Sequence, residues 1–78
     1  MQYRKKPIIV EAYQYFPNKK NKGVFYEELS EGFKPYVTTI HNNDVPICIG
    51  DWIIPEPDGI HFYPVKPDIF AETYEQVD

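Results

Sequence analysis

The chain has 78 residues, a net charge of −4 at pH 7 and 42% hydrophobic residues, which indicates one small globular domain, residues 1–78. Its single cysteine, Cys48, excludes an internal disulfide, and no stretch resembles a signal peptide. The longest apolar run, residues 8–10, is far shorter than the roughly 20 residues that a membrane span needs. We therefore expect a protein of a reducing cytoplasm, with no membrane segment.

The charges are divided unevenly along the chain. Residues 1–39 carry seven Lys or Arg against four Glu, a balance of +3, whereas residues 40–78 carry one Lys against eight acidic residues, a balance of −7. This acidic excess argues against nucleic acid as a partner, because such binding depends on neutralising many phosphates. We expect the basic cluster Arg4-Lys5-Lys6 to be a solvated segment that attracts the acidic half, within one chain or across a dimer.

Residues 8–16 are rich in β-branched and aromatic residues, which predicts the first strand. A strand that is apolar on both faces belongs in the centre of a sheet or beneath a helix. Period two divides this one into two largely apolar faces, one of which carries Ile8, Val10, Ala12, Gln14 and Phe16.

A short helix is predicted next, over about residues 25–33. Phe25, Leu29 and Phe33 recur at four-residue spacing, as on one face of a helix. Gly32 suits its C-terminal end, and Pro35 forbids its continuation.

The second half of the chain predicts an antiparallel meander, which could curl into a partly open barrel. The strongest hairpin signal is the turn Asp58-Gly59. Strands are predicted over residues 36–41, 45–49, 52–54 and 60–63.

The stretch FYPVKPDIFAETY, residues 62–74, predicts the end of the last strand and a short helix. Asp68 is expected to be the N-cap of a helix from Ile69 to about Glu75, with Phe70 and Tyr74 folded back onto the sheet. We expect most of the aromatic residues to be core. The predicted class is α+β: a small, mainly antiparallel sheet of about five short strands with one or two short helices.

Both ends of the sequence resemble a family of small proteins encoded by tailed bacteriophages and prophages. The opening YRKKPIIVEAYQ and the closing GDWII and FYPVKPDIFAETYE are similar to that family's motifs, which read close to YRKKPVxVEAxQ, GDWII and YPxKPDIFxxTYE. The turn PEPDG is longer and richer in proline than the family's turn, and His61 replaces an acidic or polar residue. The resemblance implies an accessory phage or prophage protein in the bacterial cytoplasm, but no substrate or catalytic residue.

The reactive residue types do not form a recognised catalytic or metal motif. His41, His61 and Cys48 lack the paired spacing of a structural zinc site, so we expect no metal and no cofactor. Cys48 lies between two isoleucines, where cysteine usually serves as a small buried hydrophobe rather than a nucleophile. Asp51 and Asp68 could be paired carboxylates, but turn and cap chemistry explain both.

One set of residues is a candidate ligand site. Gln14 lies on a largely apolar face, where an amide either fixes a backbone edge or lines a cleft. In the second case Gln14, Tyr63 and Lys66 would border a cleft roofed by Trp52, suited to a nucleotide-like or other anionic ligand.

Two functions follow from these observations. The first is a non-enzymatic accessory protein that forms a homodimer and binds a host or phage protein. The alternative is a small-molecule binder that sequesters a nucleotide-like or anionic ligand.

Overall fold

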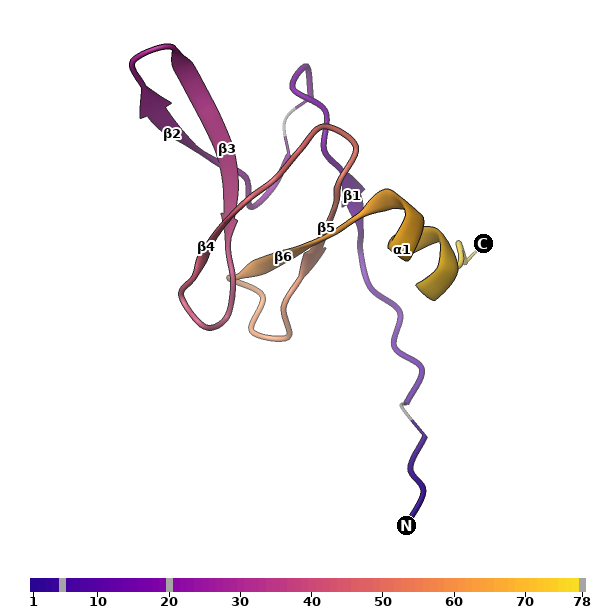
Figure 1. The fold of residues 1–78 in the computed structure, drawn as a ribbon. Coiled ribbons are helices and arrows are strands. Elements are labelled where there is room, and N and C mark those ends of the chain that lie inside the picture. Colours follow the sequence, from indigo (N-terminus) through magenta and orange to yellow (C-terminus); the bar gives the residue numbers. More distant parts are fainter. Residues whose placement is uncertain (5, 20, 78) are drawn as a thin grey trace.

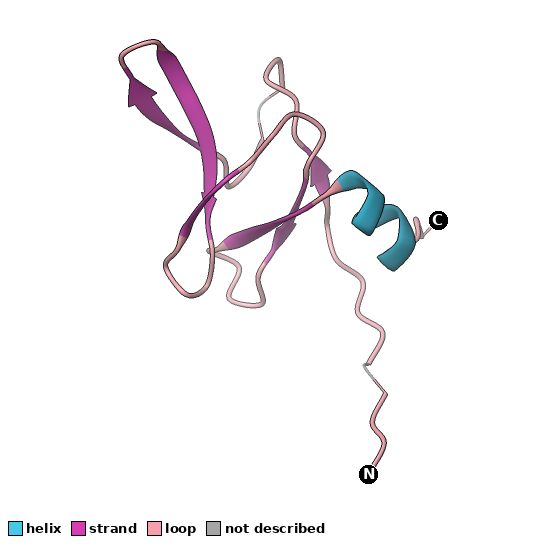
Figure 2. Ribbon diagram, viewed as in Figure 1, coloured by secondary structure: helices cyan, strands magenta, loops and turns pink. Residues whose placement is uncertain are grey.

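The computed structural model describes residues 1–4, 6–19 and 21–77, which form six strands and one helix (Figures 1 and 2). The strands build two three-stranded antiparallel sheets, with the orders β1-β5-β6 and β2-β3-β4. The predicted class is thus confirmed, but the strands form two small sheets and not a closed barrel. The elements are β1 (Tyr13–Gln14), β2 (Phe25–Leu29), β3 (Gly32–Thr38), β4 (Asp44–Pro46), β5 (Trp52–Pro55), β6 (Phe62–Val65) and α1 (Pro67–Thr73).

The first strand is much shorter than predicted. Of residues 8–16, only Tyr13 and Gln14 join a ladder, opposite Ile53 and Trp52 of β5. The predicted central position is wrong, because β1 lies at an edge of its sheet. Its apolar composition reflects the propensity for extended backbone, but no strand among the described residues pairs with Ile8 or Ile9, and both side chains are exposed.

The predicted helix over residues 25–33 is wrong, because this segment is the β2–β3 hairpin. Leu29 pairs with Gly32 across a two-residue loop, and Phe25 pairs with Tyr36 at the other end. A four-residue spacing also fits two periods of a strand, so it could not distinguish the two structures. Two runs rich in aromatic residues around Ser30-Glu31-Gly32 favour the hairpin, and Gly32 takes a φ of 131° there.

The remaining strands lie close to their predicted positions. Strand β3 begins four residues before the predicted start, β4 covers only the first part of residues 45–49, and β5 and β6 form a hairpin. The Asp58-Gly59 turn is confirmed: the Asp58 carboxylate accepts hydrogen bonds from the backbone N–H groups of Ile60 and His61, both at 2.9 Å.

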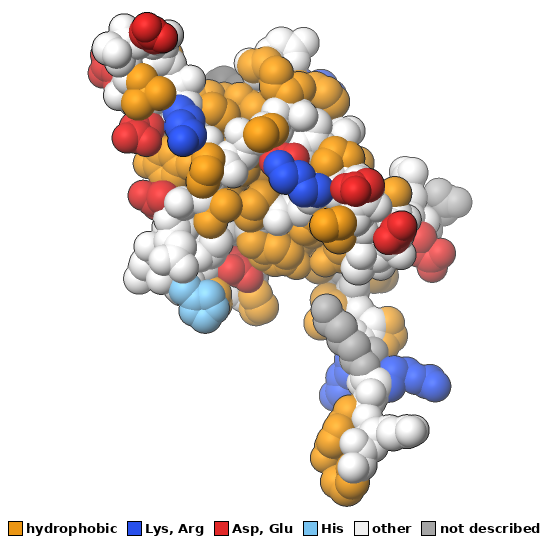
Figure 3. All heavy atoms as spheres, in the orientation of Figure 1, with side chains coloured by type: hydrophobic (Ala, Val, Ile, Leu, Met, Phe, Trp, Pro, Cys, Tyr) orange, Lys and Arg blue, Asp and Glu red, His pale blue; other side chains and the backbone are white. Residues whose placement is uncertain are grey.

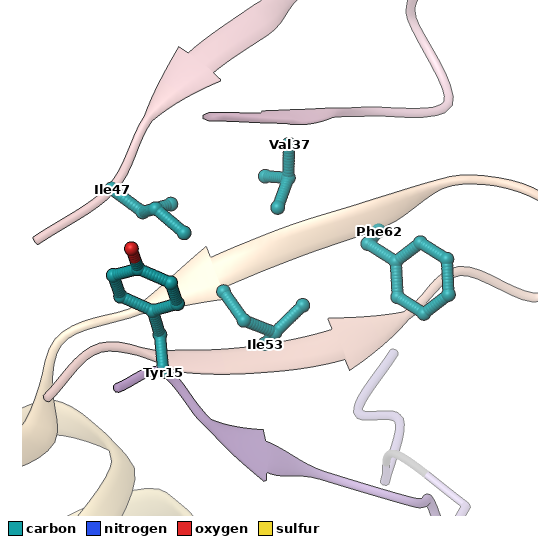
Figure 4. Close-up of a cluster of buried hydrophobic side chains, with 5 residues drawn as sticks. All are labelled: Tyr15, Val37, Ile47, Ile53 and Phe62. Atoms are coloured by element: carbon teal, nitrogen blue, oxygen red, sulfur yellow. The ribbon is translucent and has the colours of Figure 1, made fainter. Parts of the chain in front are cut away.

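A small hydrophobic core joins the two sheets. Val37 comes from β3, whereas Ile53 and Phe62 come from β5 and β6 (Figure 4). Tyr15 and Ile47 complete the cluster from segments next to β1 and β4, and all five side chains are buried. The two sheets therefore depend on this cluster for their relative position.

Helix α1 begins earlier than predicted. Lys66 occupies the N-cap position without a side-chain cap bond, and Pro67 opens the first turn, so Asp68 is not the N-cap. Proline suits the first helical position because its φ is preset and its missing N–H is not needed there. Asp68 instead places its negative charge in the first turn, where it interacts favourably with the positive end of the helix dipole.

The backbone at Gly23 approaches the core directly. Gly23 has a φ of 86°, and a Cβ there would overlap the ring of Phe62. Gly59 also has a positive φ, 72°, but a Cβ there would meet nothing within 4 Å.

We expect Gly23→Ala to lower the free energy of unfolding by about 3 kcal/mol, because it adds a core clash to backbone strain. Gly59→Ala is the matched control and should cost about 1 kcal/mol, from strain alone. Urea denaturation measures both, and equal costs would contradict the packing of Gly23 against Phe62.

Candidate functional site

Three of the four predicted ligand residues share one face of the β1-β5-β6 sheet. Gln14 pairs directly with Trp52 across β1 and β5. Trp52 also pairs with Val65, and Tyr63 lies two residues before Val65 on the same face of β6. Lys66, the fourth predicted residue, follows β6 immediately, and its ammonium group forms an ion pair with Asp51.

Helix α1 covers this face with an aromatic stack. The rings of Trp52 and Phe70 lie 4.1 Å apart at an interplanar angle of 6°, and those of Phe70 and Tyr74 lie 4.9 Å apart. The hydroxyls of Tyr63 and Tyr74 are 3.2 Å apart. The pKa of Tyr63 is raised to about 12, mainly by burial and next by this hydrogen bond. The predicted return of Phe70 onto the sheet is confirmed.

These aromatic side chains are only half-buried. The prediction that most aromatic residues form the core is wrong: Phe62 and Tyr15 are buried, whereas Trp52, Tyr63, Phe70 and Tyr74 are intermediate in exposure. The stack therefore closes the outer face of a thin sheet, and one face of the Trp52 ring is already occupied.

Asp51 fixes the turn that precedes Trp52. It is only 2% exposed, and its carboxylate accepts the backbone N–H of Cys48 at 2.9 Å and the Nζ of Lys66 at 3.1 Å. The bond to Asp51 raises the pKa of Lys66. The backbone N–H of Tyr15 donates to the Asp51 carbonyl at 2.7 Å, so the same turn holds the end of β1.

The polar groups predicted to bind a ligand thus have partners within the chain. The amide of Gln14 donates to the Gly50 carbonyl at 3.1 Å, which matches its expected role of fixing a backbone edge. The ammonium of Lys66 is paired, although 56% of its side chain is exposed. A ligand at Gln14, Trp52, Tyr63 and Lys66 would have to compete with these contacts, and its binding stays a prediction.

The other chemically reactive residues are dispersed. Within the described ranges, no group of three His, Cys, Asp or Glu lies close enough to hold a metal ion. Cys48 is exposed, so its predicted burial in a strand is wrong. Strand β4 ends at Pro46, and Cys48 already belongs to the Asp51 turn.

The β2–β3 hairpin carries an unusual concentration of exposed apolar side chains. Phe25 and Leu29 lie on one face, and Tyr26 and Phe33 lie on the other. The second face continues inward to Val37 in the core, but the tip projects beyond the body, which leaves Phe33 69% exposed (Figure 1).

Glutamates accompany these apolar side chains. Glu27, Glu28 and Glu31 are all exposed, and Figure 3 shows acidic and apolar side chains together over the hairpin. Because a helix was predicted over these residues, this exposed surface was not predicted. The Ser30-Glu31-Gly32 turn is the sequence signal that could have indicated a hairpin here.

The first residues of the sequence form a second exposed apolar element. Residues 1–4 and 6–10, here called the arm, extend from β1 away from both sheets (Figure 1). Val10 is half-buried at its root, whereas Ile9 is 81% exposed and Tyr3 and Ile8 are similarly open.

Two shallow hollows lie near the hairpin and not over the predicted ligand residues. One, of about 390 Å³, lies on the outer face of β2-β3-β4 between Glu27, Lys34 and Asp44. The other, of about 580 Å³, lies beside Lys19, Lys22 and Tyr26. Both are open to solvent and lined by charged side chains, unlike the enclosed apolar pockets that hold most small ligands.

Comparison with protein-family models, curated proteins and solved structures finds no match to this chain. The resemblance to phage proteins therefore stays a prediction. Within the described ranges, no helix has the length and apolar character needed to cross a bilayer.

Two substitutions separate the turn role of Asp51 from its ion pair. Asp51→Ala should lower the free energy of unfolding by about 3 kcal/mol, because it removes the buried carboxylate that accepts both the Cys48 N–H and the Lys66 ammonium. Lys66→Met should cost clearly less than Asp51→Ala, because a pair with an exposed lysine is screened by solvent. Urea denaturation tests this order, and a larger loss for Lys66→Met would contradict it.

The Asp58 turn gives a pH-dependent prediction. The backbone N–H of His61, then the His61 ring and the N–H of Ile60, lower the pKa of Asp58 from 3.8 to about 2. The unfolded chain binds this proton at higher pH than the folded chain, so the charged carboxylate stabilises the fold above its ordinary pKa. That contribution is lost as the pH falls toward 2.

We therefore expect Asp58→Asn to be less stable than the unsubstituted chain at pH 7, with the difference shrinking between pH 4 and pH 2. Asparagine keeps a side-chain acceptor, so the substitution isolates the charge. Urea midpoints measured across this range provide the check, and a constant difference would show that the charge has no such role.

Proposed function

We propose that this chain is a non-enzymatic accessory protein of a bacteriophage or prophage, which dimerises and binds a host or phage protein in the bacterial cytoplasm. The observation that carries the proposal is the projecting β2–β3 hairpin, with large apolar side chains on both faces. Contiguous exposed apolar surface rimmed by charge is typical of protein interaction sites.

The chemistry of the hairpin suggests the kind of partner surface. Phe25, Tyr26 and Phe33 offer flat aromatic surfaces, and aromatic residues supply most of the energy in many interfaces. The exposed glutamates beside them favour an apolar patch with a basic rim on the partner.

The shifted pKa values support a structural rather than a catalytic role. Strongly perturbed groups often mark active sites. In this chain, the turn bonds of Asp58 explain its low pKa, and burial is the largest cause of the raised pKa values of Tyr15 and Tyr63, both about 12. None of these shifts needs a catalytic explanation.

The alternative function, binding of a nucleotide-like or anionic small molecule, has one observation in its favour. The exposed stem of Lys66 holds a positive charge close to the end of the sheet that carries the aromatic stack. It is the second proposal because Lys66 is already paired with Asp51 and Phe70 covers one face of Trp52.

A comparison of two variants tests partner binding. Phe33→Ser removes an exposed aromatic side chain from the hairpin and should leave the fold intact, whereas Ile60→Ser removes a similarly exposed side chain from a distant turn. We expect Phe33→Ser to weaken binding to a partner purified from the host about 30-fold or more, as for an interface hot spot. Ile60→Ser should bind as the unsubstituted chain does.

The measurement is affinity purification with quantitative mass spectrometry, followed by calorimetric titration of the purified partner. The proposal is wrong if no protein is enriched, or if Phe33→Ser retains the same proteins with unchanged affinity.

A further inference from the structure

The arm has the composition of a strand without a neighbour. Arg4 and Lys6 give its outer part positive charge, and Ile8, Ile9 and Val10 are β-branched residues of high strand propensity. Its described residues belong to no strand or helix, run as an extended segment in Figure 1 and, apart from Val10, are exposed. Such a segment gains both hydrogen bonds and apolar burial when it joins a sheet edge.

Strand β2 offers an edge of matching chemistry. It pairs with β3 on one side only, because it is the outer strand of the order β2-β3-β4. Its five residues are all exposed, and no strand among the described residues pairs with this edge. Proteins usually protect such edges, and an uncovered one invites another strand.

The order of residues favours one direction of pairing. Strand β2 starts with Phe25 and Tyr26 and continues to Glu28 and the acidic loop. An antiparallel arm would place Ile8 and Ile9 beside the aromatic side chains and Lys6 beside Glu28. A parallel arm would place the basic residues beside the aromatic side chains and the isoleucines beside the glutamates.

One antiparallel register fits every residue of the contact. It sets Lys6 opposite Glu28, Ile8 opposite Tyr26 and Ile9 opposite Phe25, and it brings Arg4 to the hairpin loop. Pro7 then faces Glu27, and proline is compatible with an edge because alternate residues of a strand turn their N–H groups away from the neighbour.

The arm of the same chain is badly placed for this contact. Pairing of Tyr13 with Ile53 fixes the root of the arm at the outer edge of the other sheet. From there the arm runs away from the hairpin, and the two lie at opposite ends of the molecule (Figures 1 and 3). A second copy can present its hairpin to the arm without any reversal of the chain.

We propose that the arm of one copy adds to the outer edge of β2 in a second copy as an antiparallel strand. Exchange in both directions gives a closed dimer with twofold symmetry, and each three-stranded β2-β3-β4 sheet gains a fourth strand. The inference rests on the proposed function, since it gives the structural basis of the dimer, and it leaves Phe33 uncovered for another partner.

Charge exchange between the two elements tests the contact in the full chain. The arm variant carries Arg4→Glu and Lys6→Glu, and the edge variant carries Glu27→Lys and Glu28→Lys. Each variant alone places like charges across the contact, so we expect at least a tenfold rise in the dimer dissociation constant, measured by light scattering and analytical ultracentrifugation at low salt.

An equimolar mixture of the two variants should restore the dimer. The acidic arm of one then meets the basic edge of the other, and the second contact keeps its natural charges. This result separates exchange between copies from folding of the arm onto its own chain, because mixing cannot repair a contact within one chain.

A matched control carries the charge change of the edge variant at exposed positions outside the hairpin and the arm, Glu72→Lys with Glu75→Lys. This control should dimerise as the unsubstituted chain does. Circular dichroism and urea denaturation check that every variant is folded.

The outcomes distinguish this inference from the proposed function. A monomeric unsubstituted chain at millimolar concentration overturns the inference together with the dimer part of the function. A dimer that neither variant weakens, or that mixing does not restore, overturns the inference alone. The Phe33→Ser comparison is independent of all three results.

Discussion

The structure depends on one contact between two very small sheets. Val37 from β3 meets Ile53 and Phe62 from the other sheet, and Tyr15 and Ile47 close the cluster. A chain of 78 residues has little more apolar surface to bury, so most of its remaining large side chains stay partly open. The open hairpin and arm are therefore direct results of how little core the chain can build.

Polar contacts hold together parts of the fold that lie outside this small core. Asp51 ties the end of β1, the turn at Cys48 and the start of β5 together through its carboxylate and its carbonyl. The aromatic stack on α1 then protects the outer face of the same sheet. The residues that resembled a ligand site thus have structural contacts within the chain, whereas several large apolar side chains of the hairpin and arm, such as Phe33 and Ile9, stay mostly exposed.

The sequence predicted the second half of the fold better than the first. Proline, glycine and the Asp58-Gly59 pair mark the β5–β6 hairpin and α1 by local backbone chemistry, which needs no tertiary information. The spacing of Phe25, Leu29 and Phe33 fits both a helix and a strand, so only the pairing of β2 with β3 could decide between them. The length of β1 depends equally on a distant neighbour, because β5 offers it only two partners.

The pairing of β1 also has a consequence for the order of folding. The hairpins β2–β3 and β5–β6 connect near neighbours in the chain, whereas Gln14 bonds to a carbonyl 36 residues away. Closing the longer loop costs more entropy, so β1 is expected to dock after both hairpins have formed. Until β1 docks, neither sheet holds the segment that precedes it. Under the proposed exchange of arms, the chain concentration during folding, and not only afterwards, would then decide which copies pair with one another.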